Sequence, residues 1–375
     1  MFITKESGNT KKRYINMLKA MASLSRLSSE SAVPYLGYRE VENIFCKVFE
    51  AENLSRSDCS ADASKNGVGI GIKTFLEGNG KSWQKVAEFN KDASLFKSKS
   101  PNEIVLIISK LRNERINATK RIYGLNEMIY HCVVRQEGEI KVFECPMDLI
   151  DIDSIKNIKF GRSNTVTFND DINEYSINLS KSTLYKRFIT KNVILETKVE
   201  IIADPYEIIM NLLTGGNKLL FEPINKEKPH VFLPLYSETE KKKVPEKSGL
   251  NQWNANGRKR KYNEVYIPIP IFIRKNFKGF FPSRDKTFDL LLPDGKRLNA
   301  KICQDGGKAL MTNPNTDLGE WILRQVMNLN EGEILTYARL EELGIDSVVI
   351  YKEENNMYSI DFTKIGSYDE FKEGI

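Results

Sequence analysis

Two aspartates and one of the two lysines in the stretch from Asp58 to Phe75 could support the hydrolysis of a phosphate ester. Such hydrolysis uses a divalent cation held by hard oxygen ligands, and a positive charge near the attacking water or the developing negative charge. Asp62 could supply an oxygen ligand and Lys73 the positive charge. The simpler interpretation of the same residues is an edge hairpin whose lysine is solvated.

The dipeptide Asn66-Gly67 predicts the tight turn that would position these side chains, because both residues tolerate the positive φ of a two-residue hairpin turn. The turn sets three expected cross-strand pairs: Lys65 with Val68, Asp62 with Gly71, and Ser60 with Lys73. Side chains alternate along a strand, so Asp62, Gly71 and Lys73 should share one face. Ile70 and Ile72 should lie on the other face.

The chain around this hairpin predicts two domains. Its 375 residues exceed the usual size of one core, and 41% hydrophobic with 28% charged residues is typical of a globular protein. Gly, Asn, Lys and Pro collect after Gly215, as in a linker, so we expect domains at 1–220 and 229–375 joined by residues 221–228. No apolar run approaches a bilayer span and the first residues are polar, so we expect a cytoplasmic protein without a membrane segment. The five cysteines form no Cys-x-x-Cys pair, which argues against a zinc knuckle.

Helices and a mixed sheet should alternate in the first domain. Apolar residues at helical spacing predict a helix over residues 38–52, with Glu42 at the edge of its buried stripe. Ser82 is a good N-cap for a helix over residues 83–91, which would place Gln84 and Glu88 on one face. Further helices are expected at residues 102–122, 182–188 and 205–213, and paired strands at residues 128–134 and 139–145.

The hairpin resembles the PD-(D/E)xK nuclease superfamily, whose signature is an Asp, a hairpin, and then acid-x-Lys on the next strand. Gly71-Ile72-Lys73 keeps the strand and the lysine but has glycine at the position of the acid. The resemblance implies an N-terminal α/β nuclease-like domain in which Asp62 binds Mg²⁺ and Lys73 orients or activates the attacking water. It also implies that the backbone carbonyl of Ile72 completes the coordination.

The acid missing at Gly71 has three candidates, in the order Glu88, Glu42 and Asp58. In one subgroup of the superfamily a Glu on the following helix replaces it, which favours Glu88, with Gln84 as a neighbour. In other members the helix before the core sheet supplies an acid, which favours Glu42. Glu139-Ile140-Lys141 is a second acid-x-Lys string, a weaker alternative because no Asp lies between Asp92 and Asp148.

Positive charge is concentrated in the second half of the chain. Eight basic and two acidic residues lie between Glu240 and Lys261, an excess of six that equals the formal net charge of +6 of the whole chain. This run also contains amides and an aromatic residue, with little hydrophobic periodicity. Arginine and amide side chains can pair with base edges and lysine mostly contacts phosphates, so an exposed DNA-binding arm and a solvated loop are both consistent with the composition.

Short predicted strands joined by turns dominate from Val231 onwards and favour a barrel or pseudobarrel, with one strong helix at residues 318–327. The segments 249–260, 264–270, 281–282, 292–295, 300–304, 307–311, 313–315 and 318–319 resemble the B3-like DNA-recognition domain of bacterial restriction endonucleases. That resemblance implies a seven-stranded pseudobarrel that contacts duplex DNA through two arms. The implied DNA-binding residues are Asn251, Gln252, Trp253, Asn254, Arg258, Lys259, Arg260, Lys261, Gln304, Lys308, Asn313 and Asn315.

Together the two resemblances predict an α+β protein, with an α/β nuclease-like domain followed by a mostly-β, B3-like pseudobarrel. The expected function is that of a Mg²⁺-dependent type II restriction endonuclease acting on double-stranded DNA. A homodimer is expected, because one site per chain must cut two strands. The alternative is a non-catalytic, sequence-specific DNA-binding regulator whose first domain mediates assembly.

Overall fold

The structure, a computed structural model, describes residues 1–54, 59–161, 163–214, 228–240, 242–284, 286–354 and 356–374. The chain divides into two compact units. The first comprises residues 1–113 and 125–225, and the second comprises residues 114–124 and 226–375. Apart from Lys228, the expected linker at 221–228 lies outside the described residues.

The first unit contains a mixed six-stranded sheet in the order β1-β2-β3-β5-β6-β11. Its strands are β1 (Glu52–Asn53), β2 (Ala63–Lys65), β3 (Val68–Leu76), β5 (Glu127–Gln136), β6 (Glu139–Pro146) and β11 (Leu195–Lys198). Within it β3 and β5 run parallel, and the other neighbours are antiparallel. The connection between the parallel strands includes the long helix α4 (Pro101–Tyr123), as a parallel pair requires.

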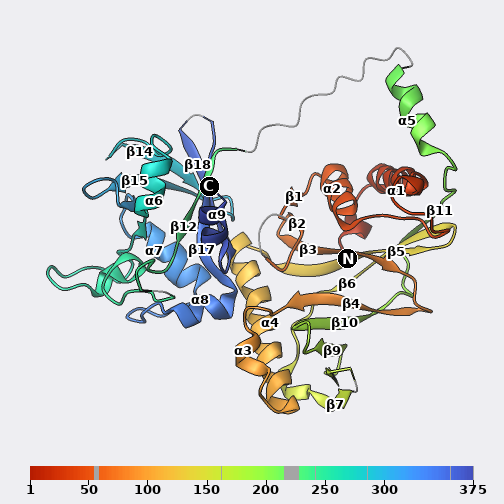
Figure 1. The fold of residues 1–375 in the computed structure, drawn as a ribbon, viewed down its shortest axis with the longest axis horizontal. Helices are drawn as coiled ribbons and strands as arrows, with labels where there is room; N and C mark the ends of the chain where they lie inside the picture. The colour runs from red at the N-terminus through yellow and green to blue at the C-terminus, as the bar shows by residue number, and fades with distance from the viewer. Residues whose placement is uncertain are drawn as a thin grey trace. The chain divides into compact units, whose positions relative to one another are not determined.

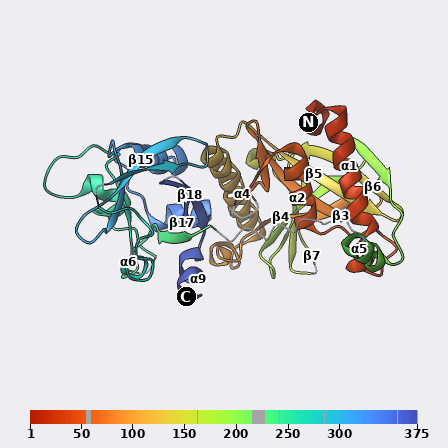
Figure 2. The same ribbon diagram turned by 90° about the horizontal axis from the view of Figure 1, so that it is seen from above.

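Two helices cover one face of this sheet, α1 (Gly8–Ser23) and α2 (Tyr38–Phe49) (Figure 1). The same arrangement is visible from above (Figure 2). The apolar stripe of α2, which includes Val41, Phe45 and Val48, packs with Ile70 and Ile72 of β3 in one buried cluster. The helix at residues 38–52 is therefore confirmed, although it ends at Phe49 because Glu50 adopts a left-handed conformation at φ 52°.

A buried polar network fixes α1 against the sheet. The hydroxyl of Tyr14 lies 2.8 Å from Nε2 of His131 on β5, and Nδ1 of the same ring lies 3.0 Å from the Glu144 carboxylate on β6. Glu144 also accepts from the backbone N–H of Ile3 at 3.1 Å. Burial, followed by the charge of Glu144, raises the pKa of Tyr14, so its hydroxyl stays protonated in this network.

A second, antiparallel sheet of the first unit has the order β4-β10-β9-β8-β7. Its strands are β4 (Lys81–Glu88), β7 (Lys156–Gly161), β8 (Thr165–Asn169), β9 (Glu174–Asn178) and β10 (Thr183–Ile189). The short helix α3 (Ala93–Phe96) and the first part of α4 pack on its apolar side chains. A further helix, α5 (Pro205–Thr214), confirms the one expected at residues 205–213.

Two of the expected helices are wrong, because residues 83–91 and 182–188 fall in the paired strands β4 and β10. The two segments pair across about a hundred residues, and Arg187 lies over the Trp83 ring at 4.4 Å. Lys186 occupies a buried position of β10, so the sequence of this strand does not alternate between apolar and polar residues as a half-buried strand usually does. Long-range pairing thus overrode the local helix signals.

The second unit is built on a seven-stranded sheet in the order β12-β17-β18-β14-β15-β16-β13. Its strands are β12 (His230–Pro234), β13 (Ile267–Pro268), β14 (Thr287–Leu291), β15 (Arg297–Cys303), β16 (Ala309–Thr312), β17 (Ile345–Lys352) and β18 (Met357–Lys364). The end strands β12 and β13 contact each other, so the sheet nearly closes into a barrel, as predicted for this region. Its helices are α6 (Ile271–Asn276), α7 (Asp317–Gly319), which continues as a π-helix over Glu320–Val326, α8 (Tyr337–Leu343) and α9 (Ser367–Glu373).

Residues 114–124 of α4 belong to the second unit through contacts with its loops and strands. The Tyr123 hydroxyl donates to the Asp361 carboxylate of β18 at 2.9 Å, and Arg121 donates to the carbonyl of Val326 at 3.2 Å. Glu114 accepts from Arg339 at 3.2 Å. None of the described helices combines the length and apolar character needed to cross a bilayer.

Candidate functional site

The β2–β3 hairpin has the predicted turn. Asn66 and Gly67 adopt φ values of 51° and 75°, and Lys65 pairs with Val68. The pairing continues to Ala63 opposite Ile70. The register inferred from Asn66-Gly67 is therefore confirmed over the length of β2.

Asp62 lies one residue beyond this paired ladder. Its backbone N–H donates to the Ile70 carbonyl at 2.8 Å, and its side-chain Oδ2 accepts from the backbone N–H of Ile72 at 2.6 Å. The carboxylate thereby takes the N–H that a further ladder pair would use. The expected pairing of Ser60 with Lys73 is wrong, because β2 begins only at Ala63.

The carbonyl of Ile72 lies on the same edge of β3 as Asp62. The N–H and C=O of one strand residue point to the same side, and the N–H of Ile72 points to Asp62. The edge where β2 ends therefore presents a carboxylate and a backbone carbonyl, two hard oxygen donors.

Gly71 faces away from the helices that cover Ile70 and Ile72. A Cβ added at Gly71 would lie 2.7 Å from Cε of Met147 and 3.2 Å from the Tyr130 ring. Ile70 and Ile72 instead join the core under α1 and α2, as the alternation predicts. An acidic side chain at Gly71 would require Met147 to move, so an acid has little room at this position.

Glu42 of α2 lies near the same edge of the sheet. It is buried, and its Oε2 accepts from Nη1 of Arg39 at 3.0 Å. Burial and then the charge of Asp62 raise the pKa of Glu42, while the charges of Arg39 and Lys73 oppose this rise. Glu42, Asp62 and Lys73 are therefore electrostatically coupled groups on one helix, one loop and one strand.

Lys73 is half-buried on β3, where it pairs in register with Cys132 of β5. Within the described ranges its ammonium makes no hydrogen bond and no ion pair. Arg39 of α2 is the cation that pairs with Glu42, which leaves the charge of Lys73 available to a ligand or to water.

Glu88 and Gln84 lie on β4 of the second sheet and not on a helix. The Glu88 carboxylate accepts from Lys85 at 2.8 Å and also from the Asn90 amide, and Gln84 donates to Ser82 at 2.7 Å. The helix that was expected to carry Glu88 towards Gly71 is therefore absent from this segment. Asp58 lies outside the described residues.

The donors at this edge suit a hard divalent cation. Two carboxylates and a carbonyl, from Asp62, Glu42 and Ile72, are oxygen ligands of the kind that Mg²⁺ takes. In the part of the chain that the structure describes, no three His, Cys, Asp or Glu side chains form a metal-binding group. Because Mg²⁺ usually keeps several waters, a partial set of protein ligands is compatible with it.

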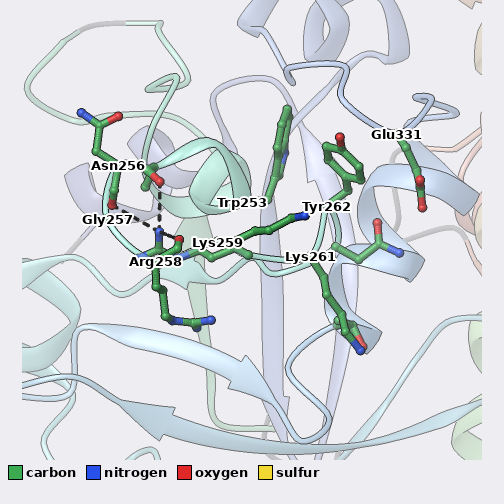
Figure 3. Close-up of a pocket in the computed structure, with 12 residues that line it drawn as sticks. Trp253, Asn256, Gly257, Arg258, Lys259, Lys261, Tyr262 and Glu331 are labelled. Carbon is green, nitrogen blue, oxygen red and sulfur yellow. Dashed lines mark hydrogen bonds between the residues drawn. The ribbon is translucent and has the colours of Figure 1, made fainter.

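A hollow of about 970 Å³ in the second unit is lined by part of the basic run (Figure 3). Trp253 and Tyr262 meet edge to face there, with ring centroids 5.3 Å apart. The remaining lining residues are Ala255, Asn256, Gly257, Arg258, Lys259, Arg260, Lys261, Asn263, Thr316 and Glu331.

Several of the predicted DNA-binding residues hold this region together. Asn251 is fully buried, and its amide exchanges hydrogen bonds of 2.9 Å with the backbone of Leu335. The expected exposed arm therefore begins after Asn251. Asn254 donates to the carbonyl of Glu246 at 2.9 Å, which ties the next turn to the preceding loop.

The two arginines of the arm are also engaged internally. Arg258 forms a two-point contact with the buried carboxylate of Glu264, with a shorter distance of 2.7 Å. Burial alone would raise the pKa of Glu264. The hydrogen bond and charge of Arg258, together with hydrogen bonds from the Lys261 backbone and the Asn315 side chain, outweigh burial, so this pKa is lowered. Arg260 donates to the carbonyls of Ala255, Asn256 and Arg258, shown as dashed lines in Figure 3.

Lys259 and Lys261 are the cations of this arm whose side chains make no hydrogen bond or ion pair to the described residues. Figure 3 shows the Lys259 side chain extending towards Trp253 and Tyr262. Gln252 and Trp253 each have a buried polar atom without a partner in that same part of the chain, Oε1 and Nε1 respectively. Of these four residues, Lys259 and Lys261 are exposed, so their ammonium groups are accessible to a ligand.

The second predicted arm flanks strand β16. Gln304 begins the turn between β15 and β16 with φ 65°, and Lys308 is exposed at the end of this turn. Asn313 is exposed after β16, and the Asn315 side chain hydrogen-bonds to Glu264. Because Glu264 also binds Arg258, this carboxylate connects the two predicted arms.

Four residues that line the hollow lie outside both predicted arms: Tyr262, Asn263, Thr316 and Glu331. Tyr262 and Asn263 directly follow the basic run, so continuing that run by two residues would have found them. Glu331 comes from a distant loop and carries no local signal.

Residues 225–354 match a family model described as the NgoFVII C-terminal B3-like DNA-binding domain. The matched range includes the hollow and both predicted arms of the second unit. A comparison with curated proteins finds no match to the chain.

Proposed function

We propose that this protein is a sequence-specific type II restriction endonuclease that hydrolyses double-stranded DNA with Mg²⁺. In this proposal the second unit binds DNA and the first unit cuts it. The match of residues 225–354 to a B3-like DNA-binding domain of a restriction enzyme family is the observation that carries the proposal.

DNA as the partner is supported by the match together with the charge of the second unit. The excess of six positive charges between Glu240 and Lys261 lies within the matched range. Phosphate contacts from lysines supply much of the affinity of DNA-binding proteins. The exposed lysines Lys259, Lys261 and Lys308 suit that role.

Cleavage by the first unit is supported by the electrostatic coupling of Glu42 to both Asp62 and Lys73. We propose that Asp62, Glu42 and the carbonyl of Ile72 hold Mg²⁺, with Glu42 in place of an acid at Gly71. Such a cation, when bound, neutralises phosphate charge and lowers the pKa of a bound water. Glu42 takes precedence over Glu88 because its pKa responds to both Asp62 and Lys73, whereas Glu88 lies in the other sheet.

Lys73 would orient the attacking water or stabilise the negative charge that develops on the phosphate. Its ammonium makes no hydrogen bond or ion pair to the described residues, and its charge acts on Glu42 together with that of Asp62, which suits this role. Arg39 would hold the Glu42 carboxylate in position through its 3.0 Å contact. Because each chain has one such site, we further propose that two chains act together on the two strands.

The direct test is incubation of the full chain with plasmid DNA in Mg²⁺ or in EDTA. We expect cleavage only with Mg²⁺, and we expect Asp62→Asn and Lys73→Ala to bind the same selected duplex without cutting it. Asn keeps an acceptor for the Ile72 N–H, so this substitution preserves the local hydrogen bond. Lys141→Ala is the matched control, because Lys141 belongs to the second acid-x-Lys string and pairs with Glu139 at 3.2 Å.

Cleavage at the wild-type rate by Asp62→Asn or Lys73→Ala would remove this edge from the active site. Loss of cleavage in Lys141→Ala alone would instead favour the second acid-x-Lys string. Specific binding without any Mg²⁺-dependent cleavage would indicate the DNA-binding regulator.

A further inference from the structure

The hollow in the second unit has the dimensions and lining of a small-molecule site. Its volume of about 970 Å³ is at the upper end of the ~300–1,000 Å³ typical of ligand pockets. A nucleobase with its sugar and phosphate would fit in such a space. The exposed ring of Tyr262, packed on the half-buried ring of Trp253, distinguishes this hollow from a simple phosphate-binding surface.

Trp253 and Tyr262 provide the surface on which a planar ring could stack. Tyr262 is 46% exposed although its ring packs against Trp253, and Nε1 of Trp253 is buried without a hydrogen-bond partner among the described residues. Bases stack on aromatic side chains whatever their sequence, because every base has a π-face. The exposed ring of Tyr262, supported by the Trp253 ring, is therefore suited to an unstacked base.

Polar groups around the rings match the other parts of a nucleotide. Lys259 and Lys261 offer positive charge to a phosphate, and Lys259 extends towards the two rings (Figure 3). Glu331 offers a carboxylate that has no partner in the described ranges, and its neighbour Gly332 lies against the Tyr262 ring. A carboxylate accepts from the exocyclic amine of a base such as cytosine.

The neighbouring polar groups are already committed to the protein. The Asn263 amide binds Glu320 and Arg324, each at 2.8 Å, and Arg258 and Arg260 are engaged as described above. The walls of the hollow are thus held in place, whereas Tyr262, Lys259 and Glu331 remain available. Base recognition in the hollow would fall to these three residues and Trp253.

We propose that this hollow receives one unpaired nucleobase of the bound DNA, stacked on Tyr262 beside Trp253. Its amine donates to Glu331, and Lys259 and Lys261 contact the adjoining phosphates. The proposal rests on the DNA-binding function proposed above and extends it from contacts in a groove to extrusion of a base. It predicts a preference at that position for a base with an amine on its pairing edge, namely adenine, cytosine or guanine over thymine.

The test measures binding of the full chain, in EDTA, to a duplex selected by the wild-type protein from a random pool. Each base in turn is deprived of its partner by an abasic site in the opposite strand. Extrusion of a base costs unpairing energy that is smallest for an unpaired or mismatched base. At one position we expect the abasic partner to tighten binding, on the order of tenfold. Elsewhere in the site the same change should weaken binding or leave it unchanged.

Variants of the hollow then test whether this tighter binding depends on its residues. Tyr262→Ala and Trp253→Ala should remove the tightening, whereas Tyr262→Phe and Trp253→Phe should keep it because an aromatic ring remains. Glu331→Gln should reduce the preference for amine-bearing bases over thymine at the same position. Tyr206→Ala and Glu354→Gln serve as matched controls, since both residues are exposed and lie outside the hollow.

The outcomes separate this inference from the proposed function. A selected duplex that no abasic partner tightens would leave specific binding intact and overturn the extruded base. Tightening that survives Tyr262→Ala and Trp253→Ala would also overturn it, because the base would then occupy another place. Failure to select any sequence would overturn the DNA-recognition proposal itself and this inference with it.

Discussion

The backbone N–H of Ile72 donates a 2.6 Å hydrogen bond to the carboxylate of Asp62. This bond joins the loop before β2 to the edge of β3 at the point where the hairpin ladder ends. A side chain thus replaces a backbone acceptor at this point. The carbonyl of Ile72 lies on the same edge, next to this carboxylate. If β2 continued, this carbonyl would accept a hydrogen bond from it in the β ladder.

The first prediction separates Glu42 from Glu88. Loss of a residue that hydrogen-bonds to a metal ligand typically lowers metal affinity or activity by ~10–100-fold. Glu42→Gln would remove a ligand itself, so it should lower Mg²⁺-supported cleavage by at least this factor. Glu88→Gln should cut at close to the wild-type rate, because Glu88 lies on β4 and contacts Lys85 and Asn90. Initial cleavage rates over a range of Mg²⁺ concentrations, with DNA binding measured in parallel, check this. Normal cleavage by Glu42→Gln together with loss of cleavage in Glu88→Gln would instead favour Glu88 as the missing acid, as expected from sequence.

The second prediction concerns pH and needs no DNA. Burial and the charge of Asp62 raise the pKa of Glu42, so the folded protein binds this proton more tightly than the unfolded chain does. The contribution of Glu42 to the free energy of unfolding therefore falls as pH rises from the ordinary carboxyl pKa to the raised one. Above that window the ionised, buried carboxylate destabilises the protein in the absence of metal.

Glu42→Gln should accordingly raise the melting temperature at neutral pH without Mg²⁺, and it should weaken the further rise that Mg²⁺ gives the wild type. Thermal unfolding in EDTA and in Mg²⁺, at pH 5 and pH 8, measures both effects. An equal Mg²⁺ effect in the two proteins would exclude Glu42 as a ligand. Glu40→Gln is a suitable control, because Glu40 is an exposed carboxylate of the same helix.

The third prediction concerns Lys308. This exposed lysine follows the turn between β15 and β16, and its side chain has no described partner. If it contacts a phosphate, Lys308→Ala should weaken binding to all sequences alike and reduce the slope of log affinity against log salt by about one. Titrations of a selected and an unrelated duplex at several salt concentrations measure this slope. A loss confined to the selected duplex would instead place Lys308 at a base edge.

The fourth prediction concerns Arg258, whose guanidinium holds the buried carboxylate of Glu264 at 2.7 Å. Arg258→Ala should destabilise the second unit by about 1–3 kcal/mol, because a buried charged group loses its hydrogen bonds. Arg258→Lys should retain part of the stability that Arg258→Ala loses, since lysine keeps the charge without the two-point geometry. Chemical denaturation of the three proteins, compared with Lys259→Ala, measures the difference. Wild-type stability with a changed base preference would assign Arg258 to DNA contact.

The elements that could be predicted from sequence are those with local causes. Asn66-Gly67 specified a turn and register through its own backbone preferences, and the apolar stripe of α2 specified its buried face. Strands β4 and β10 could not be recognised in the same way, because each is stabilised by the other across about a hundred residues. The helix proposed for residues 83–91, and with it the route for Glu88, was wrong for this reason.

The candidate sites show the same division. Asp62 and Lys73 could be proposed from their spacing about one turn, whereas the coupling of Glu42 to both depends on how α2 packs on the sheet. In the second unit the basic run was evident, but composition cannot tell an arginine that binds a phosphate from one that binds Glu264 or a backbone carbonyl. Glu331 reaches the hollow only through the folding of a distant loop.

The internal bonds of Arg258 and Arg260 have a consequence for how quickly this protein could engage DNA. A loop that is already fixed by its own side chains loses little conformational entropy when it meets a partner. Association then needs no ordering step, and its rate is set by diffusion and by the field of the surrounding lysines. Arginines that hold the loop in place would in this way contribute to the speed of target search.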